Sequence, residues 1–580
     1  MTILKTHCAL DRLRRMGRLP LLVALWALNP AAQAGSPAQN VITTPHPLAT
    51  AAGRQIIEAG GNAFDAAVAI ASVLTVVEPY GSGLGGGGFF LLRTAGDTPQ
   101  YRFLDARERA PLGIKPELYM RDGEIQADLS VDGALASAIP GQPAAMVKLS
   151  EQYGRLPIAA SLEPAIRLAR DGVEVDEHYR KWAGYRLEAL RRDPGSARLF
   201  LSDGELPAQG RRIKYPELAA SLQRLADHGR DGFYGGELAR QLVDGVRKSG
   251  GAWTLEDLSD YQVVEREPLR WKLPEGGELI SSPPPSAGGL VLVQSLGMLH
   301  SLPWRQAEPV QRAHYVVETL RRAYRDRGVL GDPDFVEMPQ ERLTTADYLQ
   351  RQASSIDPER ATPSSSLPPT EPWREGDHTT HFTVLDVQGN AVAATLSLNS
   401  MFGAAFTVPG TGILLNNEMD DFAIDVGGSN AYGLRGTAPN ALAGGKRPIS
   451  SMAPTFIESN QDFATFGTPG GSQIPSMILI SLLAYLQGEP ASSWVALPRY
   501  HHQYLPDLIT HEPDAFSKAE RDELQSLGHR LEQVATYGNQ QSIHWNKLTG
   551  KIEGASDPRG MGTTEILPAQ PAPTQQNPLR

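Results

Sequence analysis

A threonine begins a predicted β-hairpin whose polar residues could support nucleophilic chemistry. Residues 379–386 and 390–399 both alternate in hydrophobicity with the period of a strand, and a Gly-containing turn separates them. A three-residue turn puts Thr379 opposite residue 397, within one position, so Ser397 and Asn399 are expected beside it. Because a threonine hydroxyl needs a base within hydrogen-bond reach to act as a nucleophile, this polar face is a candidate site. The alternative is a half-exposed strand that carries ordinary Thr and Ser side chains.

The elements that must hold this hairpin are predicted to be an apolar strand face and several helices. The other face of the second strand is predicted to be core, with Val392, Ala394, Leu396 and Leu398. Asn62 can cap a helix whose third residue is Asp65, and the apolar residues that follow predict a buried helix. Further helices are expected over residues 215–226, 236–247 and 309–326. Residues 354–377, dense in Ser, Pro, Thr and charge, predict a mobile surface segment directly before the hairpin.

The motifs of several other enzyme classes are absent. The sequence contains no Gly-x-Ser-x-Gly elbow, no His-Glu-x-x-His and no Gly-x-x-x-x-Gly-Lys. The glycine-rich run 81–88 precedes an apolar strand rather than a helix, which favours close backbone packing over phosphate binding. The histidine pairs His501-His502 and His378 with His381 lack a third ligand at metal-binding spacing. We therefore expect no metal and no cofactor.

The size, charge and leader of the chain favour an exported globular protein. Its 580 residues, 41% hydrophobic and 21% charged, can bury one large core or two smaller ones. Residues 1–34 combine basic residues, a short apolar run and Ala32-Gln33-Ala34, which predict a secretory signal peptide, with a retained membrane anchor as the alternative. The only cysteine, Cys8, lies in this leader, so disulfides and thiol catalysis are not expected. The net charge of −11 gives no electrostatic footprint for nucleic acid or an anionic membrane.

Several blocks of the chain resemble the γ-glutamyltransferase (γ-glutamyl transpeptidase) family, in its exported bacterial form. The first block is Thr379-Thr380-His381-Phe382-Thr383-Val384, continued through Ser397-Leu398-Asn399-Ser400 to Gly403. The other blocks are Asp105-Ala106-Arg107-Glu108 and residues 84–88, 283–286, 414–421, 446–452 and 469–472. The resemblance covers roughly residues 38 to 560, which is most of the chain.

The resemblance implies an α+β fold, a four-layer αββα sandwich of the N-terminal-nucleophile hydrolase type, formed from two fragments of one self-cleaved precursor. Thr379 would attack the carbonyl of His378, an N-to-O acyl shift would follow, and water would resolve the ester, so the preceding segment would have to move aside. The freed α-amine, with a pKa near about 8, would then serve as the base for the Thr379 hydroxyl. The implied parts are a signal peptide (1–34), a large subunit (35–378) and a small subunit (379–580) with a disordered tail over 560–580.

By the same resemblance, two groups of residues would bind the two charges of a γ-glutamyl group. Arg107 would clamp the α-carboxylate with its planar fork, and Ser450 and Ser451 would add hydroxyl donors. The α-ammonium would be bound by Asn399, Glu418 and Asp421.

The remaining implied roles concern the reacting atoms and the entrance of the pocket. The backbone N–H groups of Gly470 and Gly471 would form the oxyanion hole, where glycine permits an unusual backbone. Ser397 stands where the family usually has Thr and keeps the hydroxyl that can bond to the nucleophile. Tyr432 would lie in a lid loop over the γ-glutamyl pocket.

These expectations favour an enzyme that transfers a γ-glutamyl group from glutathione or a similar donor to water, an amino acid or a peptide. The reaction would pass through a γ-glutamyl-Thr379 ester, in the periplasm or outside the cell. A glutaryl-cephalosporin acylase is the alternative enzyme, disfavoured because Arg107 and Asp421 together suit the two charges of an amino acid. A periplasmic binding protein without chemistry is the third possibility, and two fragments of about 37 and 22 kDa would exclude it.

Overall fold

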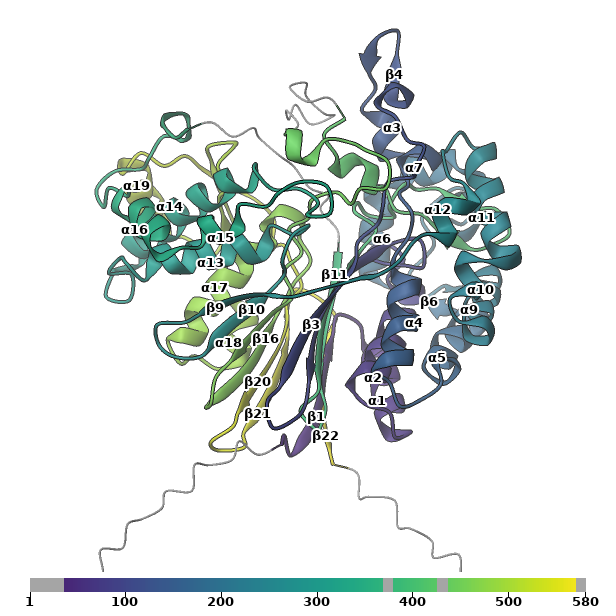
Figure 1. The fold of residues 1–580 in the computed structure, drawn as a ribbon, viewed down its shortest axis with the longest axis horizontal. Helices are drawn as coiled ribbons and strands as arrows, with labels where there is room; N and C mark the ends of the chain where they lie inside the picture. Colours follow the sequence, from purple (N-terminus) through teal and green to yellow (C-terminus); the bar gives the residue numbers. More distant parts are fainter. Residues whose placement is uncertain (1–35, 369–378, 425–436, 570–580) are drawn as a thin grey trace, which may run out of the picture. The chain divides into compact units, whose positions relative to one another are not determined.

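The computed structural model has two β-sheets stacked face to face between two groups of helices (Figure 1). It describes residues 36–368, 379–424 and 437–569, so the leader, His378 and Tyr432 lie outside the described residues. Antiparallel sheets with one helical layer on each outer side form the four-layer αββα sandwich that was expected, and the α+β prediction is confirmed.

Every neighbouring pair of strands in the two sheets is antiparallel. The first sheet has seven strands in the order β22 (Thr563–Pro568), β1 (Gln39–Thr44), β11 (Thr379–Leu385), β12 (Ala391–Ser397), β2 (Gly87–Thr94), β3 (Gln100–Ala106) and β8 (Val264–Arg266). The second sheet has six strands in the order β21 (Ile552–Ser556), β20 (Gln541–Asn546), β16 (Asp462–Phe466), β15 (Thr455–Glu458), β10 (Glu278–Ser281) and β9 (Leu269–Lys272).

The helices divide between the outer faces of the two sheets (Figure 1). The seven-stranded sheet is covered by α1 (Pro47–Glu58), α2 (Ala63–Val77), α4 (Gln142–Gln152), α5 (Ile158–Asp171), α9 (Pro216–His228) and α11 (Gly236–Lys248). The six-stranded sheet is covered by α13 (Gly288–Leu299), α14 (Pro309–Arg327), α16 (Ala346–Ser354), α17 (Ile474–Leu486) and α18 (Ala491–Ala496).

Alternation along the strands of the first sheet builds two cores. In β2, Phe90 and Leu92 belong to the cluster that includes α2, whereas Phe89 and Leu91 belong to the cluster formed with the second sheet. The helix α2 is capped by Asn62 as predicted, is buried on all sides as expected, and has a capping box in which Asp65 also bonds back to Asn62. Packing of this kind fixes the first sheet from both faces.

The hairpin of β11 and β12 has the predicted register, with Thr379 directly opposite Ser397. The predicted core face is confirmed, since Val392, Leu396 and their neighbours on that face join the cluster with α2. The interpretation as a half-exposed strand is wrong, because every residue of both strands is buried. Helices and the second sheet cover the hairpin on its two faces.

Two segments expected to be disordered or mobile are ordered elements of the fold. Residues 354–368 pack onto α14 and contain a short 3-10 helix (Ser364–Ser366). The prediction of a mobile surface segment is therefore wrong up to residue 368. Residues 369–377 of that segment lie outside the described residues. The prediction of a disordered tail is wrong for β22, because this strand pairs with all six residues of β1. Leu567 packs against the cluster that includes α2, and residues 570–580 lie outside the described part.

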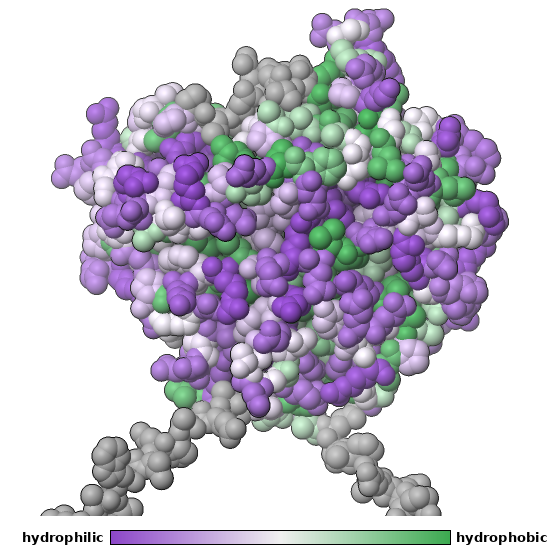
Figure 2. Space-filling view, viewed as in Figure 1, coloured by the Kyte–Doolittle hydropathy of each residue, from purple (hydrophilic) through white to green (hydrophobic). Residues whose placement is uncertain are grey.

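The visible face of the molecule is mostly hydrophilic, with hydrophobic residues in small separate patches (Figure 2). Large apolar side chains instead fill the clusters on both sides of the seven-stranded sheet. Among the described residues, no helix is both long enough and apolar enough to cross a bilayer.

Candidate functional site

Strand register brings three predicted site residues to one end of the first sheet. Thr379 pairs with Ser397 in β12, Ser397 pairs with Gly87 in β2, and Gly88 pairs with Ala106 at the end of β3. Arg107 follows Ala106 directly, so it leaves the sheet at the end where Thr379 begins β11. Thr379, the candidate nucleophile, and the buried guanidinium of Arg107 therefore lie at the same end of the sheet.

The glycine-rich run before β2 is packed too tightly for side chains. A Cβ on Gly86 would lie 2.2 Å from the carbonyl oxygen of Ser397, and one on Gly87 would lie 2.3 Å from that of Ala106. The prediction of close backbone packing is confirmed, because only glycine lets these chains approach.

Two loops of the second sheet lie next to the ends of their strands, as the register of β15 and β16 shows. The strands β15 and β16 pair with Thr455 opposite Phe466, so Ser450 and Ser451 precede one strand where Gly470 and Gly471 follow the other. The Arg107 guanidinium donates to the carbonyl oxygens of Pro448 at 3.3 Å and Ile449 at 3.1 Å, directly before Ser450.

Gly467, on the glycine loop, lies directly against His381 of β11. A Cβ on Gly467 would lie 2.0 Å from Cε1 of His381, which is two residues after Thr379. The loop that contains Gly470 and Gly471 is therefore held near the start of β11.

One buried guanidinium lies among three carboxyl groups. Nη1 of Arg107 is 2.8 Å from Oε2 of Glu418 and 3.8 Å from Oε2 of Glu108, and its Nη2 donates to Asp421. Glu418 and Asp421 lie in the 3-10 helix Glu418–Asp421, more than 300 residues after Arg107 in the sequence. All four side chains are almost completely buried.

Burial governs the protonation of these carboxyl groups. Desolvation, opposed by the charge of Arg107, raises the pKa of Glu108 to about 8 and raises the pKa of Glu418 well above its usual range. With one guanidinium for three acids, the cluster suits a ligand that adds a positive charge. An α-ammonium group next to an α-carboxylate has this charge pattern.

Asn399 is held by hydrogen bonds to Ser397 and to Asn417, the residue before Glu418. Asn399 has the left-handed φ of 74°, its N–H donates to Oγ of Ser397 at 2.8 Å, and its Nδ2 donates to the carbonyl oxygen of Asn417 at 2.9 Å. An asparagine tolerates this conformation better than most residues. Its side-chain amide thus stays beside the residue before Glu418.

Ser450 and Ser451 are fully buried and held from different sides. Oγ of Ser450 accepts from the N–H of Met452 at 3.1 Å, and Oγ of Ser451 accepts from Nε of Arg327 at 3.2 Å. The two serines directly follow Ile449, whose carbonyl oxygen accepts from Arg107. The pair is suited to donating to a carboxylate beside Arg107.

Gly470 and Gly471 adopt conformations that favour glycine. Their φ angles are 137° and 52°, and a Cβ on Gly470 would lie 2.6 Å from Cε of Met477. They open the 3-10 turn Gly471–Gln473 that leads into α17. Peptide N–H groups in such a turn can converge on an anion.

Sequence reasoning assigned no role to Glu108 or Arg327, which the structure places next to predicted site residues. Glu108 lies beside Arg107, and Arg327 bonds to Ser451. Glu108 could have been singled out because an acidic residue directly follows Arg107 in the quoted block. Arg327 is 124 residues from Ser451 in the sequence, and no local pattern links them.

The histidines considered as metal ligands have protein partners. His381 bonds to Oγ1 of Thr395 at 2.8 Å, His501 bonds to Ser476 and Gln503, and His502 lies 3.3 Å from Asp507. Within the described ranges, a different group has ligand-like spacing: His314, Glu318 and His529. This group lies on α14 and after α19 (Lys518–Ser526) and includes none of the predicted site residues.

Comparisons with known proteins agree on one family. A sequence profile described as gamma-glutamyltranspeptidase matches residues 49–567. The glutathione hydrolase proenzyme of Pseudomonas sp. (strain A14) is 36% identical over 556 residues, which cover 93% of this chain and 96% of that protein. The glutathione hydrolase proenzyme of Escherichia coli (strain K12) is 37% identical over 536 residues, with coverage of 90% and 91%.

The fold extends this likeness to solved structures. A cephalosporin acylase from Bacillus halodurans superposes with a TM-score of 0.80 at 28% identity, covering 91% of this chain and 96% of that chain. The profile spans most of the chain, and both relatives exceed 35% identity over nearly their whole length. This chain therefore belongs to the γ-glutamyltranspeptidase family.

Proposed function

We propose that this chain is a self-processing γ-glutamyltransferase and glutathione hydrolase, with Thr379 as its nucleophile. The observation that carries the proposal is a buried cluster at the end of the sheet where Thr379 begins β11. The cluster consists of Arg107, Glu418 and Asp421. This cluster offers a partner to each charge of an amino acid, and the nucleophile candidate lies beside it.

The first step is cleavage of the precursor. The Oγ1 of Thr379 attacks the carbonyl carbon of His378, and the acyl group moves from nitrogen to oxygen. Water then hydrolyses the ester and frees the α-amine of Thr379. Before cleavage this nitrogen is an amide and cannot accept a proton, so the base for the hydroxyl exists only after processing. The products are a large subunit over 35–378 and a small subunit over 379–580.

The second reaction is acyl transfer on the processed enzyme. The donor's α-carboxylate binds Arg107 with the hydroxyls of Ser450 and Ser451, and its α-ammonium binds Asp421 with Glu418 and Asn399. The pairing of Arg107 with Asp421 and Glu418 is thus exchanged for pairing with the donor. This exchange offsets part of the cost of desolvating the ligand.

The reacting carbonyl is then positioned between Thr379 and the glycine turn. Thr379 attacks the γ-carbonyl carbon, and the developing oxyanion accepts from the N–H groups of Gly470 and Gly471. The leaving amine takes the proton carried by the α-amine, and water, an amino acid or a peptide attacks the ester in turn. Ser397 faces Thr379 across the strand pair and orients its hydroxyl.

The leader supports an exported location. A basic, short apolar segment with small residues at 32–34 fits a cleaved signal peptide, which places the mature enzyme in the periplasm or outside the cell.

Thr379→Ala tests the nucleophile, with Thr380→Ala as its matched control. The Thr380 hydroxyl donates to Glu78 on the opposite face of the hairpin, so its loss leaves the reacting group intact. We expect Thr379→Ala to remain one chain without activity on γ-glutamyl-p-nitroanilide, while Thr380→Ala separates into two fragments and keeps activity. Assays with and without glycylglycine then measure transfer against hydrolysis. Cleavage of Thr379→Ala into two fragments would contradict the assignment.

A further inference from the structure

The glycine turn of the proposed oxyanion hole needs support from its neighbours. Gly470 and Gly471 have φ angles of 137° and 52°. Glycine reaches these angles without steric cost, but it reaches many others equally well, so the two glycines do not hold the turn by themselves. An oxyanion hole works because its N–H groups are fixed before the reaction begins. The restraint must therefore come from the residues on either side of the glycines.

The chain before the glycines is fixed by Thr468 and Pro469. Oγ1 of Thr468 donates to the carbonyl oxygen of Pro469 at 2.9 Å and accepts from the N–H of Asn539 at 3.1 Å. The proline ring fixes the φ angle of residue 469. The loop before β20 thus holds this end of the turn.

The residue after the glycines, Ser472, is bound from two directions. Its hydroxyl donates to Oε1 of Gln503 at 2.7 Å, and its carbonyl oxygen accepts from the hydroxyl of Tyr324. Gln503 follows β17 (Tyr500–His501), and Tyr324 lies on α14. In the proposed processed enzyme, these two anchors belong to the small and the large subunit respectively.

The amide group of Gln503 is itself oriented by hydrogen bonds. Its Nε2 donates to the carbonyl oxygen of Leu505 at 3.3 Å, so its Oε1 faces Ser472 and lies 2.9 Å from Nε2 of His501. An amide oxygen can only accept, so Nε2 of His501 carries the hydrogen. Burial lowers the pKa of His501 to about 4, which keeps the ring neutral near pH 7. The ring of His501 also packs edge to face against that of Tyr324, with centroids 5.4 Å apart.

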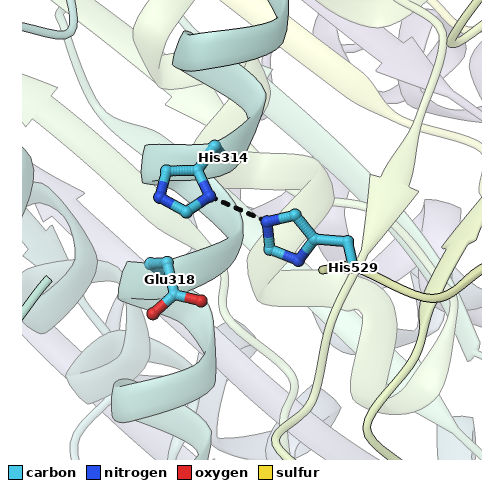
Figure 3. A group of neighbouring side chains, drawn as sticks. All are labelled: His314, Glu318 and His529. Carbon is cyan, nitrogen blue, oxygen red and sulfur yellow. Dashed lines mark hydrogen bonds between the residues drawn. The ribbon is translucent and has the colours of Figure 1, made fainter. Parts of the chain in front are cut away.

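The loop after β17 is fastened to α14, the helix of the second anchor. Asp507 in this loop pairs with Arg321 of α14, and Oε1 of Glu318 lies 3.2 Å from Nε of the same arginine. Figure 3 shows Glu318 next to the rings of His314 and His529, which bond to each other at 2.8 Å. Both anchors of the turn therefore rest on one support.

We propose that Gln503 is a positioning residue which, together with Tyr324, fixes the oxyanion turn for catalysis. This inference rests on the proposed function, in which the N–H groups of Gly470 and Gly471 bind the oxyanion. Without the Gln503 oxygen, the hydroxyl of Ser472 loses its acceptor and only Tyr324 still holds this end of the turn. A displacement of about 1 Å in a reacting geometry costs about 10²-fold in rate. Loss of one of two anchors predicts a fall in kcat of about 10- to 100-fold.

The test replaces Gln503 by leucine, which has a similar size and no acceptor oxygen. The matched control is Gln350→Leu on the exposed side of α16, where the lost oxygen accepts from Ser301 at 2.8 Å. Hydrolysis of γ-glutamyl-p-nitroanilide is measured per cleaved molecule, so that the extent of processing does not enter. We expect Gln503→Leu to lower kcat about 10- to 100-fold and the control to keep it.

Two inhibitors separate positioning of the turn from general damage to the site. L-Glutamate carries the two charges of the donor but forms no oxyanion. A glutamate analogue with a boronic acid in place of the γ-carboxyl group forms a tetrahedral adduct with the Thr379 hydroxyl and places an oxygen at the oxyanion position. Transition-state analogues report binding in the transition state. In Gln503→Leu the Ki of the boronate should rise about as much as kcat falls, while the Ki of L-glutamate stays within about twofold.

Several outcomes would overturn the proposal. An unchanged kcat in Gln503→Leu would do so, as would a boronate Ki that did not follow kcat or an equal rise in the Ki of both inhibitors. If Gln503→Leu does not fold, Tyr324→Phe removes the other anchor, with Tyr315→Phe on the same helix as its control. Tyr324→Phe must then raise the boronate Ki and leave that of L-glutamate, and an unchanged boronate Ki would overturn the proposal.

Failure of the proposed function is seen in other measurements. It would appear as cleavage of Thr379→Ala, or as an unchanged protein that does not hydrolyse γ-glutamyl-p-nitroanilide. The Gln503 and Tyr324 variants concern the rate of an enzyme that is active.

Discussion

Asp421→Asn separates a γ-glutamyl site from a glutaryl site, because the two donors differ only in the α-ammonium group. Asp421 is 2% exposed and shares Arg107 with Glu418, so an ammonium group bound to its carboxylate would be shielded from bulk water. The amide keeps the shape of the side chain and removes the charge. We expect γ-glutamyl donors to lose much more than glutaryl donors.

The magnitude follows from the burial of the pair. Removing one partner of a desolvated charge pair costs about 2 to 5 kcal/mol, or roughly 30-fold to several-thousand-fold in kcat/KM. The exchange also weakens the bond from Arg107 to residue 421, which lowers binding of the α-carboxylate. Both donors carry that carboxylate, so this loss cancels in the ratio of their kcat/KM values.

The assay compares γ-glutamyl-p-nitroanilide with glutaryl-p-nitroanilide at subsaturating concentrations. Asp420→Asn is the matched control, since this neighbouring carboxyl bonds to Ser130 at 2.6 Å instead of to Arg107. Its donor ratio should stay near that of the unchanged enzyme. Equal slowing of both donors by Asp421→Asn would refute the placement of the ammonium and would favour the acylase function.

Two further predictions concern the glycine turn and acid stability. Gly470→Ala should lower kcat by about 10²-fold or more with a smaller change in KM, because the oxyanion forms only in the transition state. The control for backbone strain is Gly488→Ala, since Gly488 has a φ of 82° and open space around it. An equal effect of both variants on kcat would count against the oxyanion hole. Burial lowers the pKa of His381 and His529 to about 3 and that of His501 and His502 to about 4, so the unfolded chain binds more protons than the folded chain at acidic pH. Their contribution to stability is therefore complete above about pH 6.5 and is lost as the pH falls toward 4, by about 1.4 kcal/mol per pH unit for each histidine. The raised pKa values of Glu108 and Glu418 act in the opposite direction, so urea unfolding at pH 7.5 and 5.5 compares uncleaved Thr379→Ala with the same chain carrying His529→Gln. The histidine variant should lose less free energy of unfolding on acidification, and an equal loss in both chains would contradict the argument.

Local features of the sequence determined the elements next to Thr379. The period of two on either side of a Gly-containing turn fixed the pairing of Thr379 with Ser397, because a one-residue slip would exchange the core and site faces. The capping box at Asn62 and Asp65 fixed the start of α2 in the same way, since its hydrogen bonds span only three residues. The family blocks added candidate roles that period and spacing do not contain.

Only the tertiary structure decided which distant residues meet, because ion pairs and edge pairing depend on strand order rather than on composition. Arg107 and Asp421 are 314 residues apart, and the order of β3, β2 and β12 brings their loops together. The Ser- and Pro-rich segment after α16 predicted mobility, yet buried partners on α14 and beyond β17 satisfy its backbone. The tail likewise became β22, because the open edge of β1 supplied the hydrogen bonds that its own sequence could not.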